Sequence, residues 1–163
     1  HWLFDIPWQK IKVVIHPQSI IHSMVTFIDG SVKALLSPPD MRIPIQYALS
    51  YPERLPNLHT KLIEPANFCN LTFQSLNLRQ YPCFSLALDA GIRGETFPAV
   101  LTASDEIAVS LFLDNKIKFT DIHKLLAKVL DQHKPTTALS LESILEADEW
   151  ARRKTIELAN QLN

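Results

Sequence analysis

An Asp29-Gly30 dipeptide stands between two apolar runs, and this arrangement constrains the fold of the first part of the chain more than any other feature. The runs extend from Met24 to Ile28 and from Val32 to Leu36. Asp-Gly accepts a positive φ angle, so the segment predicts a β-hairpin. The β-branched run from Ile11 to Ile15 predicts a further, buried strand.

A helix is expected after the hairpin, from near Arg42 to near Tyr51. Asp40 is its candidate N-cap, and the residue before Pro52 disfavours the α region, which ends the helix. From residue 52 to residue 78 the periodicity is lost, and only Asn70 to Phe73 looks strand-like. This stretch is therefore predicted to be a connecting segment.

The remainder predicts an antiparallel helical bundle, because amphipathic segments alternate with short loops. Gly94 suits the left-handed position that follows a helix. Thr120 or Asp121 and Ser140 are candidate N-caps. The predicted helices cover residues 82–92, 98–113 and 120–130, then a short helix after Ser140 and a longer one from near Asp148 to Leu162. The fold class is α+β.

Composition excludes several functions. The chain has 163 residues, 47% of them hydrophobic and 20% charged, which are values of a globular protein. Sixteen basic and seventeen acidic residues give a net charge of −1, so no nucleic-acid or membrane partner is expected. Only three glycines occur, Gly30, Gly91 and Gly94, too few for a phosphate-binding loop. Cys69 and Cys83 are interpreted as buried, reduced thiols.

Two polar segments are unusual beside strand-like runs. Residues 15–25 contain His16, Gln18, Ser19 and His22, and an unpartnered buried polar group costs about 1–3 kcal/mol. These groups therefore either satisfy one another or face a ligand. Residues 37–45 contain three prolines directly before a predicted helix.

The chain resembles the 1-deoxy-D-xylulose 5-phosphate (DXP) reductoisomerase family over nearly its whole length. The resemblance rests on the combination of segments and not on any one of them. Besides the two polar segments, they are His1-Trp2-Leu3-Phe4, Asp29-Gly30-Ser31-Val32, Tyr47 to Arg54, Tyr81-Pro82-Cys83, Pro98-Ala99-Val100-Leu101 and Phe119-Thr120-Asp121-Ile122.

The resemblance implies an enzyme that converts DXP to 2-C-methyl-D-erythritol 4-phosphate in the non-mevalonate isoprenoid pathway. It implies NADPH and a divalent cation (Mg, Mn or Co) as cofactors, a sugar phosphate substrate, a homodimer, and a cytoplasmic or plastid location. The family's glycine-rich turn and its Asp-Ser-Glu and Met-Asn-Lys-Gly-Leu-Glu segments do not occur in this sequence. We therefore interpret the chain as a C-terminal fragment that works with missing N-terminal NADPH-binding and catalytic segments. Alone it is expected to be inactive and to bind neither cofactor.

On this interpretation residues 1–51 are the C-terminal part of a mixed α/β catalytic domain, residues 52–78 connect, and residues 79–163 form a small C-terminal helical domain. The alternative is a free-standing, non-enzymatic helical interaction module in which the polar segments are merely structural.

The resemblance also suggests site residues. It places His22, with Ser19, on the wall of the substrate pocket, whereas the residues alone favour a structural histidine bonded to a backbone carbonyl. It places Pro39 and Met41 against the nicotinamide, since a thioether packs well on flat rings. His16 is interpreted as structural. No catalytic residue and no metal ligand are expected within this chain.

Asp105 and Glu106 look like paired carboxylates, but neighbouring positions on a helix point about 100° apart and do not converge. Here the chain departs from the family, because Thr102 and Asp105 replace the usual asparagines. The hydrogen bonds of those two amides are therefore in doubt.

Overall fold

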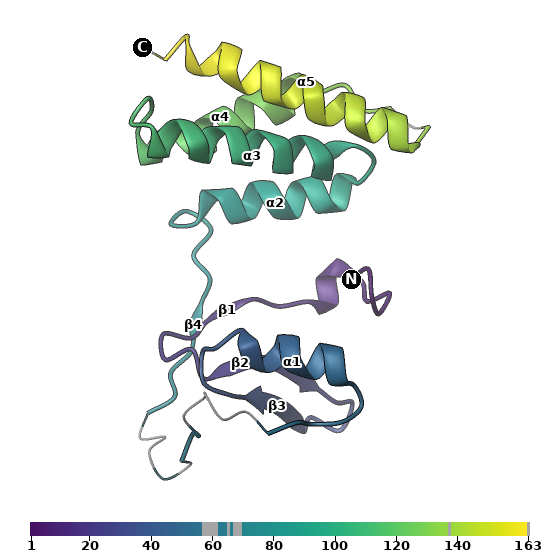
Figure 1. The fold of residues 1–163 in the computed structure, drawn as a ribbon, viewed down its shortest axis with the longest axis vertical. Coiled ribbons are helices and arrows are strands. Elements are labelled where there is room, and N and C mark those ends of the chain that lie inside the picture. The colour runs from purple at the N-terminus through teal and green to yellow at the C-terminus, as the bar shows by residue number, and fades with distance from the viewer. Residues whose placement is uncertain (57–61, 65, 67–69, 137, 163) are drawn as a thin grey trace. The chain divides into compact units, whose positions relative to one another are not determined.

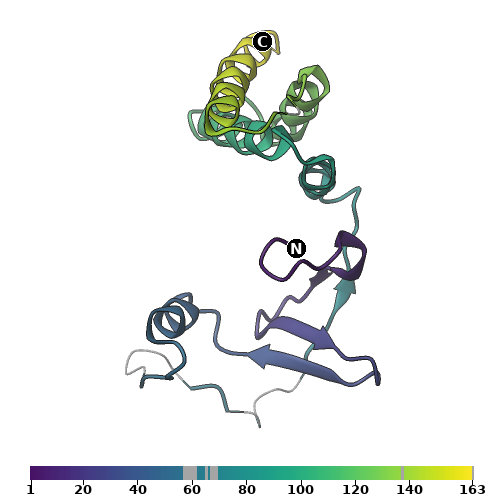
Figure 2. The same cartoon turned by 90° about the vertical axis from the view of Figure 1, so that its right-hand side faces the viewer.

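The computed structural model describes residues 1–56, 62–64, 66, 70–136 and 138–162, and it combines helices with short antiparallel strands (Figures 1 and 2). The predicted mixture of helix and strand is confirmed. The chain divides into two compact units. The hairpin unit comprises Gln9–Leu76, and the helical unit comprises His1–Trp8 together with Asn77–Asn163.

These units differ from the predicted domains at their boundaries. The first eight residues group with the helices, because Trp8 packs on Gly91 of α2 (Pro82–Arg93). A Cβ atom built on Gly91 would lie 3.0 Å from Cζ2 of Trp8. The His1 ring stacks on Trp8 with 4.5 Å between the ring centroids. Much of the predicted connecting segment groups with the hairpin instead, through contacts such as the 3.3 Å bond from Gln46 Nε2 to the Pro56 carbonyl.

The predicted hairpin is confirmed. Strand β2 (Ile21–Thr26) pairs antiparallel with β3 (Val32–Leu36). At the turn Gly30 has a φ of 84°, and the Asp29 carboxylate accepts the Ser31 amide at 2.8 Å. The Asp-Gly pair thus supplies both the positive φ and the side-chain acceptor that the tight turn requires.

Helix α1 (Arg42–Ser50) follows the hairpin as predicted. The N-cap position is Met41, one residue later than expected. Asp40 still serves the helix start, because its Oδ1 accepts the Arg42 amide at 3.0 Å.

The prediction of a buried strand over residues 11–15 is wrong. Only β1 (Val14–Ile15) is a strand, and it pairs with β4 (Gln74–Ser75). Val14 is exposed and Ile15 is half-buried, because a ribbon of two residues per strand has no second layer to cover it. The strand expected at residues 70–73 is likewise displaced to β4.

In the helical unit α2 is followed by α3 (Phe97–Leu113), α4 (Phe119–Gln132) and α5 (Leu141–Ala159). Helices α4 and α5 both pack along α3, as the two views agree (Figures 1 and 2). Gly94 ends α2 with a φ of 67°, as predicted. The predicted cap of α4 is wrong: Lys118 occupies the N-cap, and Asp121 accepts the Lys118 amide at 3.2 Å from the third position of the helix.

Helix α5 is one continuous helix, so the prediction of two helices is wrong. Ser140 does cap it, accepting the Ser143 amide at 3.1 Å. The apolar pattern weakens in the middle of the helix because Ala147 and Ala151 face the core there, and both are buried. Small side chains let α5 approach α3 closely, which an apolar pattern built on large residues does not register.

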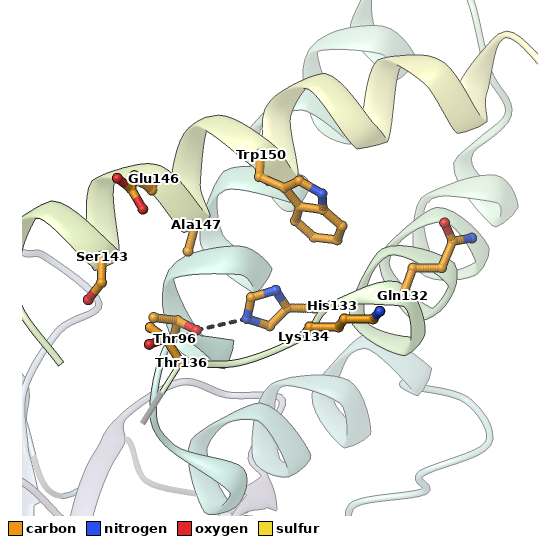
Figure 3. A pocket seen from close by; sticks show the side chains of 9 residues that line it. All are labelled: Thr96, Gln132, His133, Lys134, Thr136, Ser143, Glu146, Ala147 and Trp150. Carbon is orange, nitrogen blue, oxygen red and sulfur yellow. Dashed lines mark hydrogen bonds between the residues drawn. The ribbon is translucent and has the colours of Figure 1, made fainter. Parts of the chain in front are cut away.

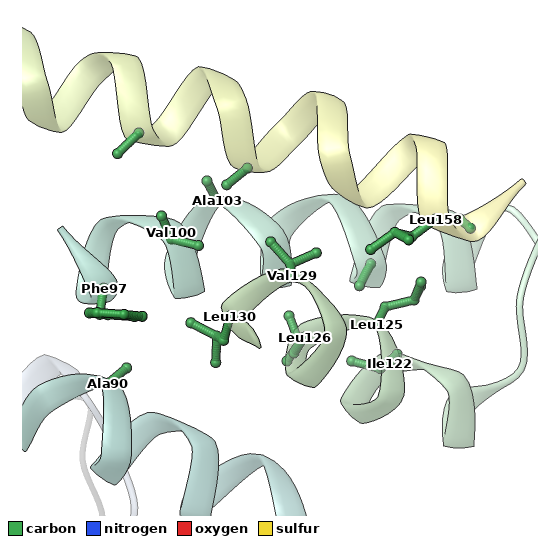
Figure 4. Close-up of a cluster of buried hydrophobic side chains, with 14 residues drawn as sticks. Ala90, Phe97, Val100, Ala103, Ile122, Leu125, Leu126, Val129, Leu130 and Leu158 are labelled. Carbon is green, nitrogen blue, oxygen red and sulfur yellow. The ribbon is translucent and has the colours of Figure 1, made fainter. Parts of the chain in front are cut away.

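One core holds the helices together (Figure 4). Fully burying a leucine or valine stabilises the fold by about 1.5–3 kcal/mol. The described residues that form this core are Ala90, Phe97, Val100, Ala103, Ala108, Ile122, Leu125, Leu126, Val129, Leu130, Ala147, Ala151, Leu158 and Ala159. Among the described helices, none is long and apolar enough to cross a membrane.

Candidate active-site wall

His22 lies on β2 in the hairpin unit, and its side chain is exposed. Its Nε2 lies 3.0 Å from the carbonyl oxygen of Ser37. A carbonyl can only accept, so Nε2 donates and Nδ1 is the acceptor of the neutral ring. The imidazole is therefore oriented by the backbone and open to solvent, and it is not sealed in an apolar interior.

Ser19 ends a turn that leads into β2. The turn is closed by a 3.0 Å hydrogen bond from the Ser19 amide to the His16 carbonyl. Ser19 has a φ of 50°, a left-handed conformation that costs a residue other than glycine roughly 1–2 kcal/mol. Its side chain is exposed. The turn therefore presents a hydroxyl group from a strained backbone.

The proline segment is fixed by its own polar groups. The Ser37 amide donates to the Ile20 carbonyl at 3.1 Å, and the Asp40 amide donates to the Pro38 carbonyl at 2.8 Å. Arg42 pairs with the Asp40 carboxylate at 2.6 and 2.9 Å. This hydrogen-bonded pairing raises the pKa of Arg42. The backbone before α1 is therefore well determined.

Pro39 and Met41 project from this fixed segment into solvent. Pro39 is exposed, and Met41 is 71% exposed. An apolar side chain that is largely exposed within its own unit is available to a ligand or partner. His22 is connected to the same segment, because it donates to the Ser37 carbonyl.

His16 has the structural role expected of it. Its Nδ1 lies 2.8 Å from the Thr72 carbonyl, and its ring stacks on Phe73 with 4.7 Å between centroids. Among the described residues, no group of three or more His, Cys, Asp or Glu side chains could hold a metal ion.

The prediction of a buried thiol is wrong for Cys83, which is exposed at the start of α2. Partial burial nevertheless raises the pKa of its thiol, and the charge of Asp105 adds to this. Cys69 lies outside the described residues.

The carboxylates on α3 do not form a site. Glu106 pairs with Arg152 of α5 at 2.5 Å, whereas Asp105 is exposed. Arg152 also binds Asp148 at 2.7 Å. Thr102, in place of an asparagine, donates to the Pro98 carbonyl one turn earlier at 3.0 Å. These groups stabilise α3 and its contact with α5.

A cavity of about 400 Å³ lies in the helical unit, and Thr96, His133 and Trp150 are among the residues that line it (Figure 3). His133 is half-buried in its wall, and its Nε2 lies 2.8 Å from Oγ1 of the fully buried Thr96. The centroids of the His133 and Trp150 rings are 5.3 Å apart. Burial lowers the pKa of His133, the charge of Arg93 lowers it further, and Glu95 opposes the shift. Sequence reasoning missed this group, since a histidine after an amphipathic helix carries no signal of its own.

Comparison with known proteins defines the class. Residues 36–154 match the family described as the DXP reductoisomerase C-terminal domain. The chain therefore contains the kind of domain that is found at the C-terminus of a reductoisomerase. It belongs to the DXP reductoisomerase family.

Relatives with this activity in their names are similar along almost the whole chain. The 1-deoxy-D-xylulose 5-phosphate reductoisomerase of Pelotomaculum thermopropionicum is 48% identical over 161 residues, which are 99% of this chain and 41% of the relative. That of Chlorobaculum tepidum is 51% identical over 162 residues, with the same coverage of both chains. The chain therefore spans about two-fifths of the length of the curated relatives it matches.

Solved structures share the fold. The Zymomonas mobilis enzyme in complex with NADPH has a TM-score of 0.88 and 39% identity, over 96% of this chain and 41% of that one. A DOX-P reductoisomerase in complex with NADPH, fosmidomycin and magnesium has a TM-score of 0.89 and 36% identity, over 98% and 41%. No finding supports the alternative of a free-standing interaction module.

Proposed function

We propose that this chain is the C-terminal portion of an NADPH- and divalent-metal-dependent enzyme that converts DXP to 2-C-methyl-D-erythritol 4-phosphate. In this proposal the hairpin unit completes the catalytic domain, and the helical unit is a separate C-terminal domain of the enzyme. The proposal is supported by relatives of that name and by the coverage of about 41% of their length.

The observation that best supports this site is the hydrogen bond from His22 Nε2 to the Ser37 carbonyl. It connects an exposed imidazole to the segment that bears Pro39 and Met41. In the proposed enzyme His22 leaves Nδ1 as an acceptor for a substrate hydroxyl, and Ser19 offers its hydroxyl to the sugar phosphate. Neither group transfers a proton in this role, so both bind and orient.

Pro39 and Met41 fit the nicotinamide, because a flat ring needs exposed apolar and polarizable surface of the kind they present. When bound, NADPH supplies the hydride and the divalent ion polarises the substrate oxygens. The chain's own residues contribute packing, orientation and exclusion of water. The metal ligands are proposed to lie in the catalytic segments outside this chain, and the parent enzyme is proposed to be a homodimer.

The test compares two purified proteins: the full-length polypeptide that ends in this chain, and residues 1–163 alone. NADPH oxidation is followed with DXP and manganese, and NADPH binding is titrated separately. The full-length protein should turn over DXP, and the chain alone should neither do so nor bind NADPH at micromolar concentration. An inactive full-length protein refutes the function. Micromolar NADPH binding by residues 1–163 alone refutes the proposal that NADPH binding requires the segments outside this chain.

A further inference from the structure

Three parts of Thr72 bind the turn that precedes β2. The carbonyl oxygen of Thr72 lies 2.8 Å from His16 Nδ1. Its amide donates to Gln18 Oε1 at 3.2 Å. Its hydroxyl accepts from Gln18 Nε2 at 2.8 Å and lies 3.2 Å from Gln18 Oε1. We call this set of contacts between Gln18 and Thr72 the Gln18–Thr72 clamp.

The clamp joins parts of the chain that are 54 positions apart and holds a turn of four residues from outside. His16 Nδ1 donates to the Thr72 carbonyl, so Nδ1 carries the hydrogen of the imidazole ring. Its Nε2 is buried and has no hydrogen-bond partner among the described residues. Leaving such an atom unpaired opposes this arrangement. The turn therefore needs other contacts to hold it, and the clamp supplies them.

The turn ends at Ser19, whose φ of 50° is unfavourable for this residue. Directly after it, the Ile20 carbonyl accepts the Ser37 amide at 3.1 Å, and Ser37 in turn accepts from His22. Thr72 is exposed and Gln18 is half-buried, so water competes for the clamp's hydrogen bonds. Such bonds contribute little to global stability but can still decide between local conformations.

We propose that Gln18 and Thr72 are positioning residues that hold Ser19 in its left-handed conformation at the substrate-pocket wall. This proposal rests on the function proposed above. Without the clamp the turn relaxes toward ordinary backbone angles, and only a fraction of the molecules present the Ser19 hydroxyl correctly. The apparent affinity for the sugar phosphate falls by that fraction. The affinity for NADPH changes by less than about twofold, since the Asp40 amide bond to Pro38 and the Asp40–Arg42 pair hold the segment of Pro39 and Met41 without the clamp.

The experiment uses the full-length enzyme with three substitutions. Gln18→Met keeps the length of the side chain but removes every clamp bond, and the KM for DXP should rise about tenfold. Thr72→Val removes only the hydroxyl bonds and should raise KM about threefold. Thr72→Ser keeps the hydroxyl and should restore the wild-type KM. In all three the KM for NADPH should stay within about twofold of wild type.

The outcomes separate the two proposals. An inactive wild-type parent refutes the proposed function and with it the role of the clamp. An active parent whose Gln18→Met and Thr72→Val variants keep the wild-type KM for DXP overturns the clamp alone. A merely structural role would reduce the active fraction, and so kcat and the melting temperature, with no change in KM. That result also overturns the proposal. If Gln18→Met fails to fold, the test is made with Thr72→Val, whose side chain has nearly the same shape as that of threonine.

Discussion

Substitution of Met41 by alanine should separate binding from stability. The Met41 side chain is 71% exposed and packs little within its own unit. Its truncation should therefore change the free energy of unfolding by less than about 0.5 kcal/mol. In the proposed complex the Met41 side chain packs on the dihydronicotinamide ring, and fully burying a methionine side chain contributes about 1.5–3 kcal/mol. The expected loss is about 1–2 kcal/mol, or roughly 5- to 30-fold in the Kd for NADPH.

Leu49 provides the matched control, because it lies on α1 in the same unit and is 85% exposed. Leu49→Ala removes a similar amount of exposed apolar surface without any proposed ligand contact. NADPH titration of the two full-length variants, followed by tryptophan fluorescence, gives both Kd values, and urea unfolding gives both stabilities. If Met41→Ala binds NADPH as tightly as wild type, or if both variants weaken binding equally, the assignment of Met41 to the cofactor is refuted.

Three further predictions concern the helical unit, each measured by urea unfolding. Ala151→Leu should lower the free energy of unfolding by about 1–3 kcal/mol, because the larger side chain overpacks the close contact between α3 and α5. The same change at the exposed Ala87 should be nearly neutral. Equal effects of the two substitutions would contradict the close packing at Ala151. Ser140→Ala removes the cap of α5 and should cost about 1 kcal/mol, and an unchanged midpoint would argue against that cap. The pKa of His133 is lowered from 6.5 by burial and by Arg93, so the stability from this neutral ring is complete above about pH 6.5 and is lost as the pH falls through the folded pKa. His133→Asn should therefore show a smaller loss of stability between pH 7 and pH 5 than wild type, and parallel pH profiles would refute this.

Local signals explain which elements could be predicted. The Asp29-Gly30 turn and the Gly94 helix end each need a positive φ that few residues accept, so the glycines themselves mark these positions in the sequence. The buried face of α4 also follows from spacing, since Ile122, Leu125 and Val129 recur at helical intervals and are all buried.

Non-local contacts explain what could not be predicted. Trp8 packs on Gly91, and neither residue carries a periodic signal that points to the other. The pairing of β1 with β4 involves two residues from each strand, too few for any pattern. The continuity of α5 depends on alanines such as Ala147, whose burial is decided by the approach of α3 and not by their own hydrophobicity.

The candidate site divides in the same way. His22, Ser19, Pro39 and Met41 came from a family resemblance, and their roles remain proposals. The hydrogen bonds between Thr72 and Gln18 could not be predicted from the sequence, because contacts between polar residues far apart in the chain produce no periodic pattern.

The chain passes between the hairpin unit and the helical unit twice, after Trp8 and after Leu76. A protease that cuts one of these crossings leaves the hairpin unit covalently attached, through the other crossing, to only one of the two segments of the helical unit. A truncation that starts at residue 79 would discard Trp8 and strip α2 of its aromatic cover at Gly91. An excised helical unit should therefore be made by joining residue 8 to residue 77 through a short linker, so that Trp8 stays with α2.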